Sequence, residues 1–269
     1  MAEPEPLIKA RGIGKRFGAV VALHGVDLDL RSGEVLALLG DNGAGKSTFV
    51  KILAGAHAPT EGTLSIGGRP VALASPKDAA GHGVATIYQE LALSENLVVA
   101  ENVFLGHELV RRVLGVPFLR RAAMRARVRA LLDDLDAHIP DIGAPVGSLS
   151  GGQRQAVAIA RALNLDARLV IMDEPTAALA VAETRKVLSL TRRLAASGRA
   201  VVIVSHNIAD VFEVADRMVV FRRGRKIAER QRDQTDPDEI VALITGAHPD
   251  ARAADRPQER PDPTGDTGS

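Results

Sequence analysis

The stretch Gly40-Asp41-Asn42-Gly43-Ala44-Gly45-Lys46-Ser47 (GDNGAGKS) carries the strongest structural signal in this sequence. It follows the short apolar run 34–39, which is typical of a buried strand, and it precedes residues 46–53, which predict a helix. A glycine-rich loop between a strand and a helix lets backbone N–H groups surround a phosphate without side-chain clashes, and the helix N-terminus adds partial positive charge. The stretch therefore predicts a loop that binds a nucleoside triphosphate. The alternative is a glycine-rich turn that only caps the helix.

Individual residue types in this loop suit distinct roles at a triphosphate. Lys46 would neutralise β- and γ-phosphate oxygens, Ser47 would place its hydroxyl on Mg²⁺, and Thr48 would donate a further hydrogen bond to a phosphate. The preceding residues 40–45 contribute mainly their backbone amides. We therefore expect every residue from 40 to 48 to contact the nucleotide.

Two acidic residues follow a second apolar run, 169–172, and stand where a parallel sheet binds its ligands, at the carboxyl end of a strand. Asp173 is expected to hold the metal through water. Glu174 is expected to orient and polarise the attacking water as general base. The alternative is that these carboxylates only cap the next helix, helped by Pro175.

Apolar runs and helical patterns alternate along the chain, which favours a three-layer α/β core with a mainly parallel sheet. Strands are predicted at residues 7–10, 22–30, 34–39, 62–66, 85–88, 169–172, 201–204 and 218–221, and helices at 46–53, 122–135 and 181–196. Turn signals at Gly67–Gly68 and Arg223–Gly224 predict hairpins. Residues 91–161 have a helical texture and are expected to form an inserted lobe. The tail after Gly246 has few large apolar residues and is expected to be disordered.

The composition is that of a globular protein and points to no particular partner. Hydrophobic residues make up 46% of the 269 residues, and 34 basic against 33 acidic residues leave a net charge of +1, so no global field favours nucleic acid or anionic lipid. The absence of cysteine excludes disulfides, thiolate metal sites and thiol nucleophiles. We expect neither a secretory signal at the acidic, proline-containing start nor a membrane-spanning segment, so any membrane association would go through a partner.

Four strings together resemble the ATP-binding subunits of ABC transporters: GDNGAGKS at 40–47, LSGGQ at 149–153, VIMDEPT at 170–176 and SH at 205–206. They follow the order and spacing of that family over residues 7–246. The resemblance implies a P-loop ATPase core with a mainly parallel sheet, an antiparallel β part and an inserted helical subdomain. It thus predicts one ATPase domain at 1–246, with the helical subdomain at about 91–161 and a disordered tail at 247–269.

The resemblance also implies roles for three residues outside the strings that bind phosphate and metal. Gln89 would sense Mg²⁺ and the attacking water, His206 would contact the γ-phosphate, and Phe17 would stack on adenine. Each residue has a simpler interpretation: a solvated glutamine at a strand end, a structural histidine and a core phenylalanine. The nucleotide is expected to be ATP.

LSGGQ is implied to act on the nucleotide of a second subunit. Ser150, Gly151, Gly152 and Gln153 would contact the γ-phosphate held by the phosphate loop of the other copy, in a head-to-tail dimer. Ser150 with Gln153 also fits a helix capping box, and both interpretations can hold together. One departure from the family is Ala180, where the usual residue is an aspartate that helps to couple the two sites.

Within the family, the strings at 88–106, EPTAAL and SHN resemble the ATPases of bacterial carbohydrate importers of the fructose, ribose and xylose types. This implies an ATPase coupled to sugar import, peripheral at the cytoplasmic face of the inner membrane. Its implied partners are a second copy of itself, a polytopic permease and, indirectly, a sugar-binding protein. The alternative is a soluble ATPase of the same family that acts on nucleic acid or ribosomes. Paired cassettes, a basic linker or a long coiled coil would mark that class; none is visible, so we expect no nucleic-acid partner.

The segment 111–129 contains seven arginines, and no acidic residue occurs from Leu109 to Leu132. It suits a face near membrane phosphates or a permease, or a solvated helix face.

Overall fold

The computed structural model describes residues 5–113, 116–177 and 179–254; the expected tail beyond 254 and the first four residues lie outside them. Its centre is a six-stranded sheet in the order β12-β11-β3-β10-β9-β6. Five neighbouring strands run parallel, and only β12 is antiparallel, to β11. The strands are β3 (Val35–Leu39), β6 (Val84–Ile87), β9 (Leu169–Asp173), β10 (Ala200–Val204), β11 (Arg217–Arg222) and β12 (Arg225–Gln231). This confirms the predicted mainly parallel core.

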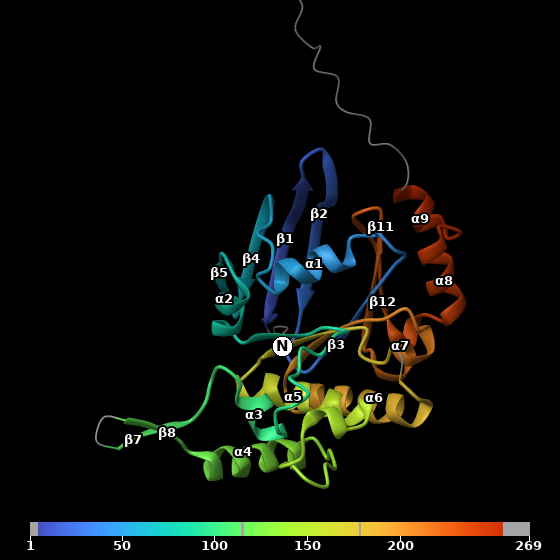
Figure 1. The fold of residues 1–269 in the computed structure, drawn as a ribbon. Helices are drawn as coiled ribbons and strands as arrows, with labels where there is room; N and C mark the ends of the chain where they lie inside the picture. Colours follow the sequence, from blue (N-terminus) through green and yellow to red (C-terminus); the bar gives the residue numbers. More distant parts are fainter. Residues whose placement is uncertain (1–4, 114–115, 178, 255–269) are drawn as a thin grey trace, which may run out of the picture.

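A second, antiparallel sheet of four strands has the order β2-β1-β4-β5. Its strands are β1 (Ile8–Phe17), β2 (Val20–Leu30), β4 (Glu61–Ile66) and β5 (Arg69–Val71), and β1 extends well beyond the four residues predicted for it. Helix α1 (Lys46–Leu53) lies beside this sheet in Figure 1. Leu36 and Leu38 of the central sheet share one apolar cluster with Phe49 of α1 and with residues of β1 and β2.

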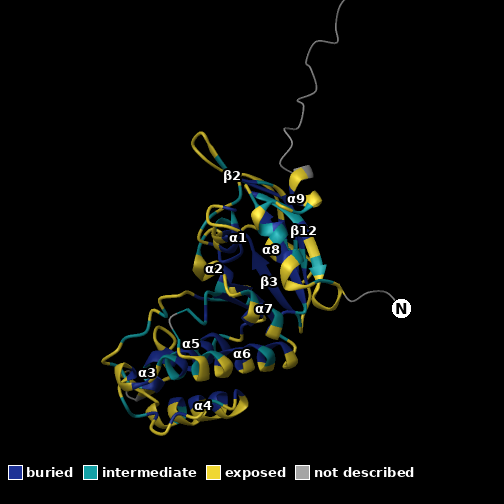
Figure 2. Ribbon diagram, turned by 90° about the vertical axis from the view of Figure 1, so that its right-hand side faces the viewer, coloured by how far each residue is buried: buried dark blue, intermediate teal, exposed yellow. Residues whose placement is uncertain are grey.

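The opposite face of the central sheet packs on helices. A second apolar cluster lies on this face and contains Val201 and Ile203 of β10. Val202 and Val204 belong to the cluster with Phe49 on the other face, because successive strand residues point to opposite faces. The helices on this side include α3 (Val99–Phe104), α4 (Arg121–Asp134), α5 (Gly151–Asn164), α6 (Val181–Ala196) and α7 (Ile208–Val214). Figure 2 shows the buried strand β3 inside and exposed residues along the outer side of α4. The result is the three-layer arrangement expected from the sequence.

Two parts of the chain differ from the predicted pattern. A hairpin of β7 (Val110–Val113) and β8 (Val116–Leu119) interrupts the region expected to be helical, because its valines favour strand and Pro117 lacks the N–H that a helix interior needs. Part of the tail expected to be disordered is also ordered: residues 249–254 form α9 (Pro249–Ala254), where Ala251 is fully buried.

The remaining short elements are α2 (Pro76–Gly81), α8 (Pro237–Thr245) and the 3₁₀ turns η1 (Val146–Ser148) and η2 (Arg232–Gln234). No helix within the described ranges is both long enough and apolar enough to cross a bilayer.

Candidate nucleotide site

Most of the predicted phosphate, metal and catalytic residues line one cavity of 560 Å³ at the carboxyl ends of the parallel strands, but Gly40 and Asp41 do not. Residues 42–48 of the loop after β3 form one wall. The other residues come from the ends of β1, β6, β9 and β10: Phe17, Gln89, Asp173, Glu174 and His206. The order of the strands explains this meeting, because β3, β10, β9 and β6 are successive neighbours whose carboxyl ends share one edge.

The loop owes its close approach to neighbouring backbone to glycine at two positions. Gly40 has φ +143°, and a Cβ there would collide with the carbonyl oxygen of Phe221. Gly45 has φ +106°, and its Cβ would come within 2.8 Å of Leu23 Cδ2. Neither backbone conformation suits an L side chain, so the spacing of glycines in the sequence reports a real steric requirement.

Lys46 is the buried cation of the cavity. Its side chain is 6% exposed, and its Nζ donates to the carbonyl oxygens of Gly40 at 2.6 Å and Asp41 at 3.0 Å. Burial lowers its pKa, and the nearby carboxylates of Glu174, Asp41 and Asp173 oppose that shift only in part. An ammonium group that is desolvated and held only by neutral carbonyls is well suited to accept an anionic phosphate.

Asp173 and Glu174 face the cavity from the end of β9. Burial raises the pKa of the Asp173 carboxyl, and repulsion from Glu174 raises it further. Glu174 has φ +51°, an uncommon backbone conformation for a residue with a Cβ, and its N–H donates to Val204 O at 2.8 Å. His206 Nε2 lies 2.8 Å from Glu174 Oε1. The pair thus joins β9 to the segment after β10.

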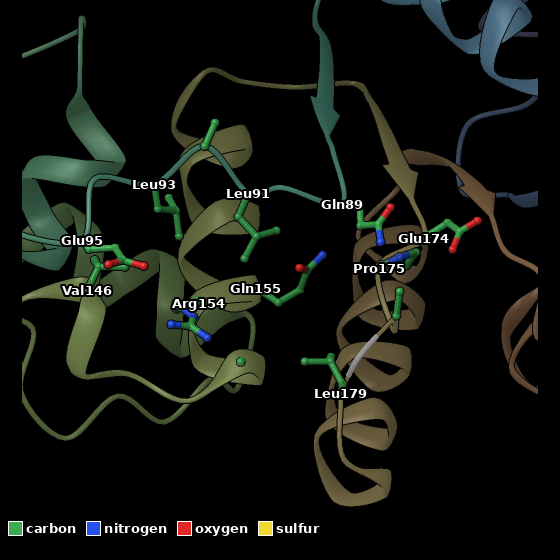
Figure 3. A pocket seen from close by; sticks show the side chains of 13 residues that line it. Gln89, Leu91, Leu93, Glu95, Val146, Arg154, Gln155, Glu174, Pro175 and Leu179 are labelled. Atoms are coloured by element: carbon green, nitrogen blue, oxygen red, sulfur yellow. The ribbon is translucent and has the colours of Figure 1, made fainter.

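Gln89 lines this cavity and also a neighbouring one of 330 Å³ between the core and the helical lobe. Figure 3 shows Gln155 of α5 pointing from the lobe toward Gln89 and Pro175. Gln155 is buried, and its Nε2 has no hydrogen-bond partner. Gln155 is not predicted from the sequence, because its only signal is its place two residues after LSGGQ.

Phe17 is 45% exposed at the rim of the cavity, so it is not the core phenylalanine of the simpler interpretation. Its ring meets the edge of His57 at 5.3 Å between centroids, and Lys15 Nζ lies 5.0 Å from its centroid. An exposed aromatic face beside a phosphate loop offers a stacking surface for a base.

No residue of LSGGQ lines the 560 Å³ cavity of its own chain, although Gly151 lines the neighbouring 330 Å³ cavity together with Gln89 and Glu174. Ser150 is the N-cap of α5, and the capping box is complete: Gln153 N donates to Ser150 Oγ at 3.4 Å, and Ser150 N donates to Gln153 Oε1 at 3.0 Å. Glu183 of α6 is near this helix end, where a hydrogen bond from Ser150 lowers its pKa. The capping interpretation therefore holds, and the N-terminus of α5 is a positive end that already attracts a carboxylate.

Ala180, the departure from the family pattern, is the N-cap of α6 and forms no side-chain cap. The sequence did not predict a hydrogen bond close to this position in the chain, in which Thr176 Oγ1 donates to Asp210 Oδ2 of α7 at 2.7 Å. Ala178, quoted with the same motif, is outside the described residues.

Curated relatives resemble this chain over most of its length. It is 48% identical over 239 residues to the xylose/arabinose import ATP-binding protein XylG of Sulfolobus acidocaldarius, which covers 89% of this chain and 94% of that protein. It is 46% identical over 254 residues to the fructose import ATP-binding protein FrcA of Rhizobium meliloti, with 93% and 98% covered. The ribose import ATP-binding protein RbsA of Yersinia pestis is 44% identical over 241 residues, but these span only 46% of that protein.

Solved structures share the fold. A nucleotide-free ATP-binding cassette from an ABC transporter superposes with a TM-score of 0.74 at 24% identity, covering 92% of this chain and 97% of that chain. A dimeric cassette in a post-hydrolysis state, bound to ADP and Pi, has a TM-score of 0.68 at 26% identity, with 84% and 98% covered. The family profile described as ABC transporter matches residues 23–177. With the two full-length relatives, this match shows that the chain belongs to the ABC transporter family of ATP-binding, ATP-hydrolysing proteins.

Proposed function

We propose that this protein is the ATPase subunit that powers a sugar importer. The observation that carries the proposal is the identity of 48% and 46% to pentose and fructose import ATP-binding proteins over nearly their whole lengths. In this proposal the protein is peripheral at the cytoplasmic face of a bacterial inner membrane. A polytopic permease binds it there, and a sugar-binding protein acts on the far side.

Phosphate binding rests on the loop and on Lys46. The backbone amides of 40–48 cradle the phosphates, and the Lys46 ammonium leaves its loop carbonyls for β- and γ-phosphate oxygens. Phe17 stacks on the adenine from the rim of the cavity.

Mg²⁺ fits the oxygen donors that line the cavity. Ser47 would bind it directly, and Asp173 and Gln89 through water. The raised pKa of Asp173 supports this assignment, because a buried carboxyl without a full counter-charge gains from a nearby cation. The ion would supply charge neutralisation on the phosphates.

Glu174 takes a proton from the attacking water as the bond from water oxygen to the γ-phosphorus forms and the bond to the β-γ bridging oxygen breaks. His206, 2.8 Å from the same carboxylate, holds Glu174 in place and donates toward the γ-phosphate. The displaced electron pair ends on ADP.

The second half of each site would come from another copy. Ser150, Gly151, Gly152 and Gln153 do not line the 560 Å³ cavity of their own chain, yet they form the positive end of α5. In a head-to-tail homodimer each of these ends would meet the γ-phosphate of the opposite subunit.

Glu174→Gln tests the catalytic assignment. We expect ATP binding to persist, turnover to fall by about 100-fold or more, and an ATP-dependent dimer to accumulate, because only proton transfer is removed. Isothermal titration, phosphate release and size-exclusion chromatography with ATP measure the three effects. Glu213→Gln, at an exposed glutamate of α7, is the matched control. Hydrolysis at the wild-type rate in the Glu174 variant would exclude the general-base role.

The transport assignment needs a separate experiment. The protein, reconstituted with the permease that co-purifies with it and with its binding protein, should hydrolyse ATP faster when a pentose or hexose is added. Stimulation by amino acids alone, or co-purification with ribosomes in place of a permease, would contradict it.

A further inference from the structure

The hairpin β7–β8 projects from the helical lobe, beyond α3 and α4, at the left edge of Figure 1. Over the described residues its two strands pair with one another, and neither has an extensive contact with a further helix or strand. A lone two-stranded hairpin is marginal in water. At its base, Arg120 N donates to Leu109 O at 2.7 Å, and α4 starts directly after it.

Both faces of this hairpin carry exposed apolar side chains. Val110 pairs with Leu119 on one face, and these are 54% and 45% exposed. Phe118 and Val116 belong to the other face and are 54% and 53% exposed. Exposed apolar side chains on both faces, close in sequence to a group of arginines, suit insertion among anionic lipid headgroups, which can surround a hairpin on every side.

Arginines occur on this hairpin and along the helix that follows it. Arg111 and Arg112 lie on β7, and the others follow on or just before α4: Arg120, Arg121, Arg125, Arg127 and Arg129. Among the described residues, the one carboxylate that pairs with this set is Glu101, 3.6 Å from Arg121. The group thus keeps most of its positive charge available.

The arginines do not serve the stability of α4. Arg121 stands in the first turn, which holds no acidic residue, and the helix dipole disfavours a cation there. Arg121, Arg125 and Arg129 follow one another at four-residue intervals, so like charges are neighbours along one side of the helix. The buried residues Met124, Val128, Leu131 and Leu132 form the adjoining side of the same helix, so these arginines lie along the border of its buried face. An external anionic surface would offset this repulsion.

We propose that the lipid-contact surface, defined as β7, β8 and the arginines of 111–129, binds anionic phospholipid headgroups directly. The apolar side chains enter the interfacial region while the guanidinium groups pair with phosphates. Both strands have unpaired outer edges, so the hairpin stays at headgroup depth, where water and phosphate satisfy its backbone. This goes beyond the proposed function, which attaches the protein to a membrane only through a permease.

Flotation of the full-length protein with vesicles tests the proposal. We expect binding to vesicles of phosphatidylcholine that contain phosphatidylglycerol, much weaker binding to phosphatidylcholine alone, and a decline with rising salt. Arg111→Gln with Arg112→Gln should weaken binding about 25-fold, at about fivefold for each arginine. Arg69→Gln with Lys77→Gln removes the same charge from exposed residues elsewhere and should leave binding unchanged. Phe118→Ser should weaken binding by about fivefold, and Val241→Ser, at an exposed valine of α8, should not.

Four results would overturn the proposal: no binding to either kind of vesicle, equal binding to neutral and anionic vesicles, equal losses in the two arginine pairs, or displacement by ribosomal RNA at similar affinity. Loss of permease binding in the hairpin variants without any vesicle binding would make the hairpin a protein interface. ATP turnover and thermal unfolding should match the wild type in all of these variants. If vesicle binding is absent while ATP turnover is normal, the lipid proposal is wrong and the proposed ATPase function still stands.

Discussion

At the residue scale, the candidate site concentrates charge that the nucleotide-free fold does not neutralise well. The pKa of Lys46 is lowered and that of Asp173 is raised, both first of all by burial. Each charged form is thus disfavoured in the folded protein until a ligand of opposite charge arrives. The burial of these two charged groups thus favours ligand binding and lowers the stability of the folded protein without its ligand.

Asp173→Asn should therefore stabilise the nucleotide-free protein at neutral pH. A raised carboxyl pKa means that the folded state binds the proton more tightly than the unfolded state, so ionisation costs stability above the folded pKa. That cost fades as the pH falls through the folded pKa. We expect a higher Tm for the variant, by about 2–4 °C for each kcal/mol removed, and a difference that shrinks toward acid pH.

Thermal melts of the two proteins across pH measure this, with Asp134→Asn at an exposed position of α4 as control. A variant that melts below the wild type at neutral pH and converges on it in acid would reverse the sign and refute the argument. The same variant should gain less stability than the wild type from ATP with Mg²⁺.

At the element scale, Arg217 of β11 joins the two sheets. It is 4% exposed, and its guanidinium donates to the Glu34 carboxylate at 2.5 and 2.9 Å, to Glu229 of β12 at 2.5 Å and to the Asp29 carbonyl of β2 at 2.6 Å. The hydrogen bonds to the two glutamates hold its pKa above that of a free arginine, although burial opposes the shift. This buried cation thus adds a polar link between β2 and the central sheet to the apolar packing of the two sheets.

Arg217→Met should lower the free energy of unfolding by about 3–5 kcal/mol, because it leaves the largely buried Glu34 carboxylate without the Arg217 counter-charge. Denaturant titration measures the loss. Arg193→Met, which breaks the exposed pair with Asp136, should cost about 1 kcal/mol or less. Adding Glu34→Gln to Arg217→Met should recover part of the loss; a double variant weaker than the single one would show that packing, not charge, dominates.

At the scale of the whole molecule, the proposed head-to-tail dimer would share its sites, since no residue of LSGGQ lines the 560 Å³ cavity of its own chain. Lys46→Ala and Ser150→Phe proteins should each be inactive alone, because each spoils both sites of a homodimer. Mixed, they should regain about a quarter of the wild-type ATPase rate, since half of the dimers are mixed and each mixed dimer has one intact site. Activity that does not recover on mixing, in proteins shown to exchange subunits, would argue against head-to-tail sites.

Local sequence patterns predicted most of the central sheet, the phosphate loop and the acidic pair Asp173 and Glu174, whereas Phe17, Gln89 and His206 were implied by the family resemblance. A strand, a glycine loop and a helix are contiguous, and two acids after an apolar run mark the end of a strand without further information. Residues whose importance depends on distant partners were missed. Arg217 and Glu34 are 183 positions apart, and Thr176 and Asp210 are 34 apart. The β7–β8 hairpin was missed because short valine-rich runs between helical stretches give a weak periodic signal.

The sequence by itself determined that this protein binds a nucleoside triphosphate, because the steric need for glycine at Gly40 and Gly45 and the charge of Lys46 are written in consecutive residues. Only the tertiary structure decided which distant residues complete the site. The strand order β11-β3-β10-β9-β6 brings the phosphate loop, His206, Glu174 and Gln89 to one edge, and that order follows from crossovers and packing that no local pattern specifies. It also decided that no residue of LSGGQ lines the 560 Å³ cavity of its own chain and that the hairpin stands apart from the core.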